Sequence, residues 1–359
     1  MTTLTAISAK VHAGERLSEA DALALYASND LLAIGELAAL ANERKNGRNV
    51  YFNVNRHINP TNICVNRCVF CAFSRTGNEA DAYTLTRDEM VRRALEAKGQ
   101  GATEVHLVGG LHPDLPFTFY LELLQAIHAA VPQLHIKAFT AVELDWFASI
   151  SGLTLQQVLA QLMAAGLGSM PAGGAEILVE EVRQKICPEK ISGRRWLEIH
   201  RLAHQAGLKT NCSMLYGHVE NHADRVRHMA MLRELQDETG GFQVFIPLAW
   251  QPENSPLKLE VKGTSGLDDL KTLAIGRLFL DNIPHVKAYW IMLGEKIAQV
   301  ALSFGVDDLD GTVVEEKIGH DAGASSPQGL TLERLIRLVR LAGKQPVERD
   351  TLYRPLRSF

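Results

Sequence analysis

A predicted β-strand runs directly into three closely spaced cysteines in residues 49–71, which read NVYFNVNRHINPTNICVNRCVFC. The β-branched and aromatic residues at the start of this stretch favour a strand over residues 49–57. Cys64, Cys68 and Cys71 follow in the next loop. In an α/β barrel the loops that follow the strands form the face where active sites gather. We therefore expect the three thiols at the mouth of such a fold.

Outward from this stretch, short apolar or β-branched runs alternate with segments of helical periodicity. Eight strand–helix pairs in strict alternation favour a parallel sheet, and eight strands are the number that closes a barrel. An open doubly wound sheet is the alternative, but no Gly-rich phosphate-binding sequence follows the first strand. We predict an α/β fold, a (β/α)8 barrel of the TIM type. Its strands would span residues 49–57, 104–109, 135–141, 168–172, 209–216, 242–248, 286–292 and 309–314. Its helices would span residues 86–98, 118–130, 155–165, 196–206, 222–239, 268–280, 295–303 and 332–342.

The first 48 residues differ from the alternating part and are predicted to form a short helical extension. Ser18 with Asp21 can cap one helix, and Asn29-Asp30 can cap a second. Residues 49–359 would form the barrel together with a C-terminal helical segment, because no Pro-, Gly- or Ser-rich linker divides them. Residues 319–329 are the expected flexible loop.

The composition indicates a globular protein with a large core, since 46% of the 359 residues are hydrophobic and 22% are charged. A net charge of −4 gives no electrostatic reason to expect nucleic acid or an anionic membrane as a partner. We find no apolar run long enough to span a bilayer and no secretory signal at the N-terminus. The expected location is the cytoplasm.

The chain has five cysteines, and three of them fall within eight residues. An odd total with this clustering is a poor disulfide framework and a good metal framework in a reducing compartment. Structural zinc is one reading, but zinc sites usually pair cysteines as C-x2-C with a second pair elsewhere, which is absent here. Three thiolates suit a [4Fe–4S] cluster in which one iron has no protein ligand.

The C-x3-C-x-aromatic-C pattern of Cys64, Cys68, Phe70 and Cys71 resembles the signature of the radical S-adenosylmethionine superfamily. In that superfamily the cluster's fourth iron is chelated by the amino and carboxylate groups of S-adenosylmethionine. One electron from the cluster then cleaves the co-substrate and releases a 5′-deoxyadenosyl radical. The resemblance therefore implies a [4Fe–4S] cluster, S-adenosyl-L-methionine and a reducing electron-donor protein.

Other positions resemble the superfamily's S-adenosylmethionine site. Gly109-Gly110 closes the second predicted strand, where a Gly-Gly backbone edge receives the methionine ammonium; glycines permit such a close approach of the main chain. Phe70 matches the aromatic residue beside the adenine. Glu176 and Glu143 are candidates to accept hydrogen bonds from the ribose hydroxyls.

Further segments resemble the aminofutalosine synthase family of the menaquinone pathway. Close relatives of that family are dehypoxanthine futalosine cyclase and the tyrosine-using subunit of FO synthase, which remain alternatives. Residues 135–143, 186–188 and 210–217 resemble the synthases more than either relative. The matching segments are residues 56–62, 109–116, 135–143, 172–176, 186–188, 235–242 and 346–353.

This family resemblance implies a transferase that adds the 5′-deoxyadenosyl radical to 3-[(1-carboxyvinyl)oxy]benzoate. The products would be 6-amino-6-deoxyfutalosine, methionine and CO2 or bicarbonate. An aryl enol-ether dicarboxylate needs cations or strong hydrogen-bond donors in its pocket. If Lys137 points into the barrel, it needs an anionic partner. The candidates at strand ends are Arg56, His57, His112, Lys137, Tyr216 and His218.

A function of a different class is also open. The cysteines could belong to a non-catalytic metal-binding module with a partner role, which would hold zinc or a cluster that does not respond to S-adenosylmethionine. Cys187 could be an exposed and reactive thiol, although a small packed residue is favoured. Cys212 lies on a predicted strand, where a core residue is expected, and is too isolated in sequence to be named as a ligand.

Overall fold

The computed structural model describes residues 3–259 and 263–359. Its centre is a set of parallel strands at each of the eight predicted places, and the first predicted strand is split in two at Val54. The strands are β1 (Asn49–Asn53), β2 (Asn55–Ile58), β3 (Glu104–Leu107), β4 (His135–Ala138), β5 (Ser169–Met170), β6 (Lys209–Tyr216), β7 (Phe242–Ala249), β8 (His285–Val286) and β9 (Asp308–Gly311).

These strands close into a barrel. Strands β2 to β8 form one parallel sheet in sequence order, and β9 pairs with β1 in a second sheet. The two sheets join at both edges. Lys287, next to β8, bridges to Asp308 of β9, and the His57 amide of β2 donates to the Val314 carbonyl at 2.9 Å. The predicted (β/α)8 barrel is therefore confirmed, with β1 and β2 as one bent strand.

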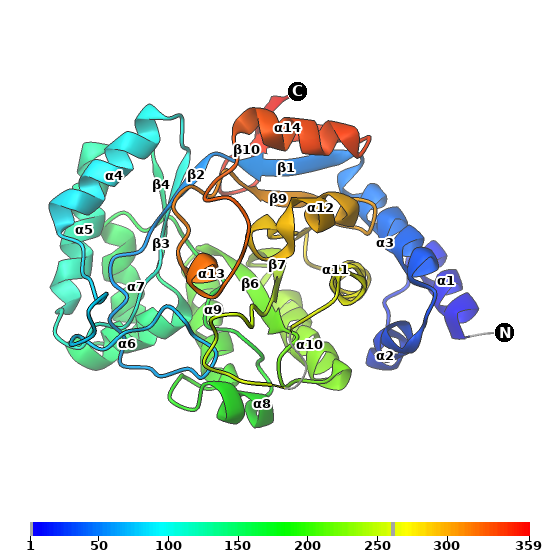
Figure 1. The fold of residues 1–359 in the computed structure, drawn as a ribbon, viewed down its shortest axis with the longest axis horizontal. Coiled ribbons are helices and arrows are strands. Elements are labelled where there is room, and N and C mark those ends of the chain that lie inside the picture. The colour runs from blue at the N-terminus through cyan, green and yellow to red at the C-terminus, as the bar shows by residue number, and fades with distance from the viewer. Residues whose placement is uncertain (1–2, 260–262) are drawn as a thin grey trace.

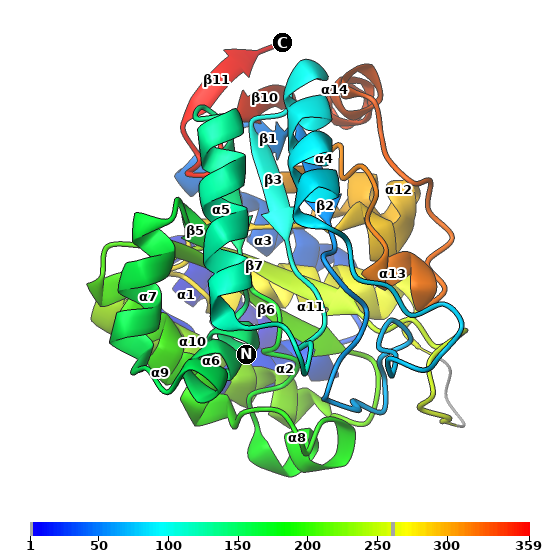
Figure 2. The same ribbon diagram turned by 90° about the vertical axis from the view of Figure 1, so that its left-hand side faces the viewer.

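Helices surround the strands, as Figures 1 and 2 show. Each of the eight predicted helices is present. Helix α12 is kinked at Gly294, and its second part starts at the predicted residue 295. Several begin at capping boxes, which fix a helix start by two reciprocal hydrogen bonds; Thr86, Thr154 and Asn221 supply three of them. The eight helices are α4 (Arg87–Gly99), α5 (Phe117–Ala130), α7 (Leu155–Ala164), α9 (Gly193–Gln205), α10 (His222–Thr239), α11 (Gly266–Phe279), α12 (Trp290–Ala301) and α14 (Leu332–Leu341).

Three helices around the barrel mouth were not predicted. The longest, α6 (Ala141–Ser151), begins where the sequence predicted strand up to residue 141, because Thr140 and Glu143 form a capping box there. The other two are α8 (Glu180–Ile186) and α13 (Ile318–Asp321), the second of which lies partly within the expected flexible loop.

The N-terminal extension packs on one side of the barrel. Helices α1 (Thr3–Ala13), α2 (Glu19–Ala27) and α3 (Leu31–Asn46) lie beside α10 and α11, at the right of Figure 1. Ser18 and Asp30 cap α2 and α3 as predicted, whereas α1 was not predicted. A buried apolar cluster runs from this extension through the barrel.

Two strands that were not predicted follow α14 at the C-terminus. Strand β10 (Gln345–Arg349) pairs in parallel with β1, and β11 (Pro355–Ser358) pairs antiparallel with β10. The run Pro-Val-Glu-Arg at 346–349 is buried throughout, which a solvent-facing helical tail would not be. None of the helices in the described part of the chain is long and apolar enough to cross a membrane.

Candidate active site

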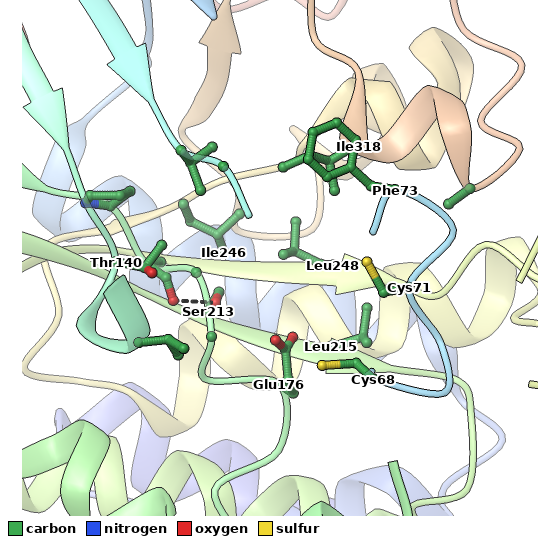
Figure 3. A pocket seen from close by; sticks show the side chains of 18 of the residues that line it. Cys68, Cys71, Phe73, Thr140, Glu176, Ser213, Leu215, Ile246, Leu248 and Ile318 are labelled. Carbon is green, nitrogen blue, oxygen red and sulfur yellow. Dashed lines mark hydrogen bonds between the residues drawn. The ribbon is translucent and has the colours of Figure 1, made fainter. Parts of the chain in front are cut away.

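A cavity of about 300 Å³ opens at the carboxyl ends of the barrel strands. Figure 3 shows side chains from several strands and loops entering it, among them Cys68, Cys71 and Glu176. A concave site at this face of a (β/α)8 barrel is the usual position of catalytic chemistry.

The cysteine loop, residues 59–85, is folded back on itself between β2 and α4. Thr61 donates from its hydroxyl to the Tyr83 carbonyl at 2.7 Å, and Asn62 accepts from the Tyr83 amide at 2.8 Å. Closer to the cysteines, the Cys64 amide donates to the Arg75 carbonyl at 3.0 Å. The segment Asn-Pro-Thr-Asn before the cysteines is therefore hydrogen-bonded to the C-terminal end of the loop. These bonds hold the three thiols at the mouth of the barrel.

All three thiols of this loop line the cavity. Cys68 is buried, while Cys64 and Cys71 are half-buried. Burial raises the pKa of Cys68 to about 12, so a metal must displace its proton on binding. Three thiols around an open cavity suit a cluster with one free iron position. Within residues 3–259 and 263–359, no three His, Cys, Asp or Glu side chains are arranged for a single metal ion, as structural zinc would require.

Gly109 and Gly110 line the cavity beside the cysteine loop. The Gly110 amide donates to the Thr61 carbonyl at 2.9 Å. A Cβ built on Gly110 would lie 2.2 Å from the carbonyl oxygen of Ile63 and 3.1 Å from Cβ of Cys64. The cysteine loop packs directly on this backbone edge and therefore requires glycine at position 110. The sequence analysis explained the glycines by the close approach of a ligand to the main chain.

Glu143 is buried at the start of α6 and lines the same cavity. Its carboxylate accepts hydrogen bonds from the Thr140 amide at 2.7 Å and from the Gly109 amide at 3.2 Å. Burial raises its pKa to about 7, against the effect of these hydrogen bonds. The side chain links the Gly-Gly edge to the first turn of a helix and can exchange a proton near neutral pH.

Glu176 faces the cysteines from the segment after β5 (Figure 3). Its backbone has a φ of +45°, in the left-handed region that is costly for a residue with a Cβ. Its carboxylate pairs with Lys190 Nζ at 2.5 Å. Burial alone would raise the pKa of Glu176, but Lys190 lowers it below its usual value. The carboxylate is therefore ionised and available as a hydrogen-bond acceptor.

Lys190 is a site residue that the sequence analysis missed. Its Nζ lies 5.2 Å from the centre of the Phe70 ring, and Phe70 lines the cavity. Burial would lower the pKa of Lys190, but Cys68 and Glu176 raise it above its usual value. The nearby string Ile186-Cys187-Pro188 was noted only as a resemblance, and it offered no signal for a cation at this place.

Four of the six polar candidates lie outside the cavity. Arg56 points outward between β2 and α4, where it pairs with Glu315 at 2.8 Å and Glu96 at 3.1 Å. Tyr216 points to the helix layer and donates to Asp269 at 2.7 Å. Successive residues of a strand face opposite sides. Because His57 and Leu215 face inward, their neighbours Arg56 and Tyr216 face outward.

The other two are held in turns. His112, two residues beyond Gly110, accepts from the Asp114 amide at 3.1 Å and is half-exposed. His218 is enclosed in the turn after β6, where its Nε2 lies 3.0 Å from the Leu215 carbonyl oxygen. The structure therefore does not bring His112 or His218 to the thiols.

His57 and Lys137 do reach the cavity. Lys137 is buried and pairs with Glu104 at 2.7 Å, which supplies the anionic partner that an inward lysine was expected to need. Sequence analysis did not single out several other polar lining residues of the cavity, among them Glu104, His106, Asn211, Lys287 and Asp310.

Between the thiols and these polar groups the cavity wall is apolar. Leu215, Ile246 and Leu248 come from β6 and β7, and Ile318 comes from α13 (Figure 3). The site thus has three zones, namely thiols at the mouth, an apolar middle and a polar interior.

Comparison with known proteins identifies the family. The sequence profile of the radical SAM superfamily matches residues 58–232, and that of the CofH/MqnC C-terminal region matches residues 239–358. The chain is similar in fold to the FeFe-hydrogenase maturase HydG from Carboxydothermus hydrogenoformans. The TM-score is 0.76 at 18% identity, covering 98% of this chain and 80% of that one.

Two relatives are similar in sequence over most of their length. Aminodeoxyfutalosine synthase from Thermus thermophilus is 49% identical over 99% of this chain and 96% of the relative. The 5-amino-6-(D-ribitylamino)uracil–L-tyrosine 4-hydroxyphenyl transferase from Methanopyrus kandleri is 43% identical over 87% of this chain and 86% of the relative. With the thiol triplet at the mouth of a closed barrel, these matches show that the chain belongs to the aminodeoxyfutalosine synthase family of radical S-adenosylmethionine enzymes.

Proposed function

We propose that this enzyme joins the 5′-deoxyadenosyl group of S-adenosylmethionine to the vinyl carbon of 3-[(1-carboxyvinyl)oxy]benzoate. The products would be 6-amino-6-deoxyfutalosine, methionine and CO2 or bicarbonate, as a step of menaquinone biosynthesis. Support comes from the 49% identity to synthases over nearly the whole chain. The observation that carries the proposal in the structure is one cavity that connects the thiols with an apolar middle and a polar interior.

Radical S-adenosylmethionine enzymes use a [4Fe–4S] cluster, which when bound supplies the electron that cleaves the co-substrate. Cys64, Cys68 and Cys71 would hold that cluster. The backbone edge at Gly109 and the Glu143 carboxylate line the same cavity as the thiols, where they would receive the methionine ammonium.

Glu176, which also lines this cavity, would accept hydrogen bonds from the ribose hydroxyls. Lys190 keeps Glu176 ionised and fixes its position through the 2.5 Å ion pair. Phe70, held near Lys190, offers an aromatic face for the adenine. The apolar wall would hold the arene and exclude water, which a reactive radical requires.

Product analysis tests the proposal directly. Cluster-loaded, anaerobic enzyme is incubated with dithionite, S-adenosylmethionine and the carboxyvinyloxybenzoate, and mass spectrometry identifies the products. We expect an adenosyl-containing adduct and one methionine per turnover. Release of 5′-deoxyadenosine without an adduct would contradict the assignment. In cells a reducing electron-donor protein would replace dithionite.

The archaeal relatives favour one second candidate, a transfer reaction that uses tyrosine. Six relatives between 38% and 43% identical carry the name of a tyrosine 4-hydroxyphenyl transferase. Incubation with L-tyrosine and 5-amino-6-(D-ribitylamino)uracil in place of the benzoate separates the two. A coupled product with these substrates, and none with the benzoate, would replace our proposal.

A further inference from the structure

Six polar side chains project into the barrel below the cysteine loop and form what we call the inner polar cluster. They come from five separate parts of the barrel wall and all line the cavity. The inner polar cluster consists of His57 (β2), Glu104 and His106 (β3), Lys137 (β4), Lys287 (after β8) and Asp310 (β9).

The strand register places three of these residues at one level. His57 lies opposite His106, and His106 lies opposite Lys137. The two imidazole rings have their centres 4.5 Å apart. Glu104 precedes His106 by two residues and therefore faces the same side of the strand. The cluster is thus built by the barrel itself and does not depend on a loop.

Two ion pairs are buried within it. Lys137 pairs with Glu104 at 2.7 Å, and Lys287 pairs with Asp310 at 2.5 Å. These side chains are between 1% and 10% exposed. Barrel interiors are usually filled by branched apolar residues, and a buried ion pair seldom stabilises a fold more than such residues would. Stability alone does not account for charges here.

Several polar atoms of this region are buried without a partner among the described residues. They are Nε2 of His57, Nε2 of His106 and Oδ1 of Asn211. His57 is only 5% exposed, Asn211 is 4% exposed, and both line the cavity. Leaving such a group unsatisfied costs about 1–3 kcal/mol, so the two ring nitrogens indicate a ligand that completes them.

The charge state of the cluster defines the ligand. Burial lowers the pKa of both histidines, so they are neutral and each can donate from one ring nitrogen. The ammonium groups of Lys137 and Lys287 each have three N–H donors, and the carboxylate partner of each lysine does not use all three. The free donors suit an acceptor oxygen, and the neighbouring apolar wall suits an arene.

We propose that the inner polar cluster binds an aryl carboxylate, with His57 and His106 donating hydrogen bonds to it and Lys137 and Lys287 offering the ammonium donors that Glu104 and Asp310 leave free. This inference rests on the proposed function and assigns the ring carboxylate of its substrate to the barrel interior. Gly110 lies so close to the cysteine loop that a Cβ on it would be 3.1 Å from Cβ of Cys64. Gly110 follows His106 by four residues, up to about 13 Å along an extended chain. The vinyl group of the same molecule would then face the thiols.

Equilibrium binding tests this assignment without turnover. Cluster-loaded, unreduced enzyme with S-adenosylmethionine is titrated calorimetrically with 3-hydroxybenzoate and with phenol, which lacks the carboxylate. The variants are His106→Leu, the conservative His106→Gln, and the double substitution Glu104→Gln with Lys137→Met, which removes both charges of one pair. His128→Gln, on α5 outside the cavity, is the matched control.

We expect the wild type and the control to bind 3-hydroxybenzoate at least about tenfold more tightly than phenol. His106→Leu and the double variant should lose that preference, and His106→Gln should keep part of it. Equal binding of the two probes by the wild type would overturn the assignment. An unchanged preference in both His106→Leu and the double variant would also overturn it. The visible absorbance of the iron–sulfur cluster shows that these variants are folded and loaded.

The two proposals fail in different ways. A histidine-dependent preference for 3-hydroxybenzoate without any adenosyl adduct from the dicarboxylate would leave the aryl carboxylate site standing and reject the proposed reaction. An adduct formed by an enzyme that does not prefer the carboxylated probe would keep the reaction and reject the site.

Discussion

The cysteine loop and the inner polar cluster line one cavity but are built in opposite ways. The loop takes its chemistry from one contiguous stretch, residues 59–85, whose internal hydrogen bonds hold the thiols in place. The cluster gathers side chains between His57 and Asp310 from strands that meet only in the closed barrel. A site built from one contiguous stretch can be recognised as a sequence motif. A site built from separate strands can be predicted only if the register of every strand is known.

The largest effect is expected at the loop. Cys68→Ala removes one of three cluster ligands, so bound iron, the visible absorbance and product formation should all be lost together. Cys187→Ala and Cys212→Ala are the matched controls, because both thiols are buried and neither lines the cavity. Iron counting on anaerobically purified protein measures the result. Full iron content in Cys68→Ala would show that Cys68 is not a cluster ligand and does not differ from the core cysteines in this respect.

Gly110→Ala tests whether the barrel positions the loop. Its Cβ would clash with the Ile63 carbonyl at 2.2 Å, so the loop must shift. We expect destabilisation by about 1–3 kcal/mol, typical of overpacking, together with reduced iron content. Gly99→Ala, with nothing within 4 Å of its Cβ, should change neither. Thermal unfolding and iron analysis check both variants. Normal iron loading in Gly110→Ala would show that the loop holds its thiols independently of β3.

Lys190→Met tests the group that the sequence analysis missed. Without this cation the buried Glu176 carboxylate becomes costly, and its pKa should rise so that it takes up a proton. A protonated carboxyl is a poorer acceptor for ribose hydroxyls, so we expect S-adenosylmethionine to bind about tenfold more weakly. The exposed Lys185→Met is the control. Unchanged affinity in equilibrium titrations would remove Lys190 from the site.

The last effect, which is confined to one window of pH, is a pH dependence at Glu143. Its pKa is about 7 in the folded chain against an ordinary 4.5, so the folded state binds this proton more tightly. Its contribution is present below about pH 4.5 and is lost as the pH rises through 7, up to about 3 kcal/mol. The unfolding temperature of the wild type should therefore fall more steeply over this window than that of Glu143→Gln.

The matched variant is Glu181→Gln on the exposed surface of α8. It should follow the wild type across the same pH range. Parallel curves for the wild type and Glu143→Gln would show that this carboxyl does not hold a proton near neutral pH.

The fold was largely predictable because its signals are local. Alternating apolar runs marked the eight strands, and helix caps such as Thr86 and Asn221 lie where residue type and spacing indicate them. Strand β10 was missed because its pairing with β1 is a long-range contact, and β11 was missed with it because β11 pairs only with β10. Helix α6 was missed because Thr140 and Glu143 act as a cap at the end of an apparent strand.

The site was predictable only in part. The thiols, Phe70 and Gly109-Gly110 lie in recognisable strings and all line the cavity. Arg56 and Tyr216 were expected there, but strand alternation turns both toward the surrounding helices. His106 and Lys287 carried no local signal, since their importance arises from neighbours that the chain brings together only on folding.

A crystal structure of the cluster-loaded, unreduced enzyme with S-adenosylmethionine and 3-[(1-carboxyvinyl)oxy]benzoate would test the central claim most directly. We predict that the ring carboxylate lies within about 3.2 Å of Nε2 of His57 or His106, with the vinyl carbon facing the thiols. The reverse orientation, with the ring carboxylate at the cysteine loop, or a benzoate bound outside the barrel, would contradict it.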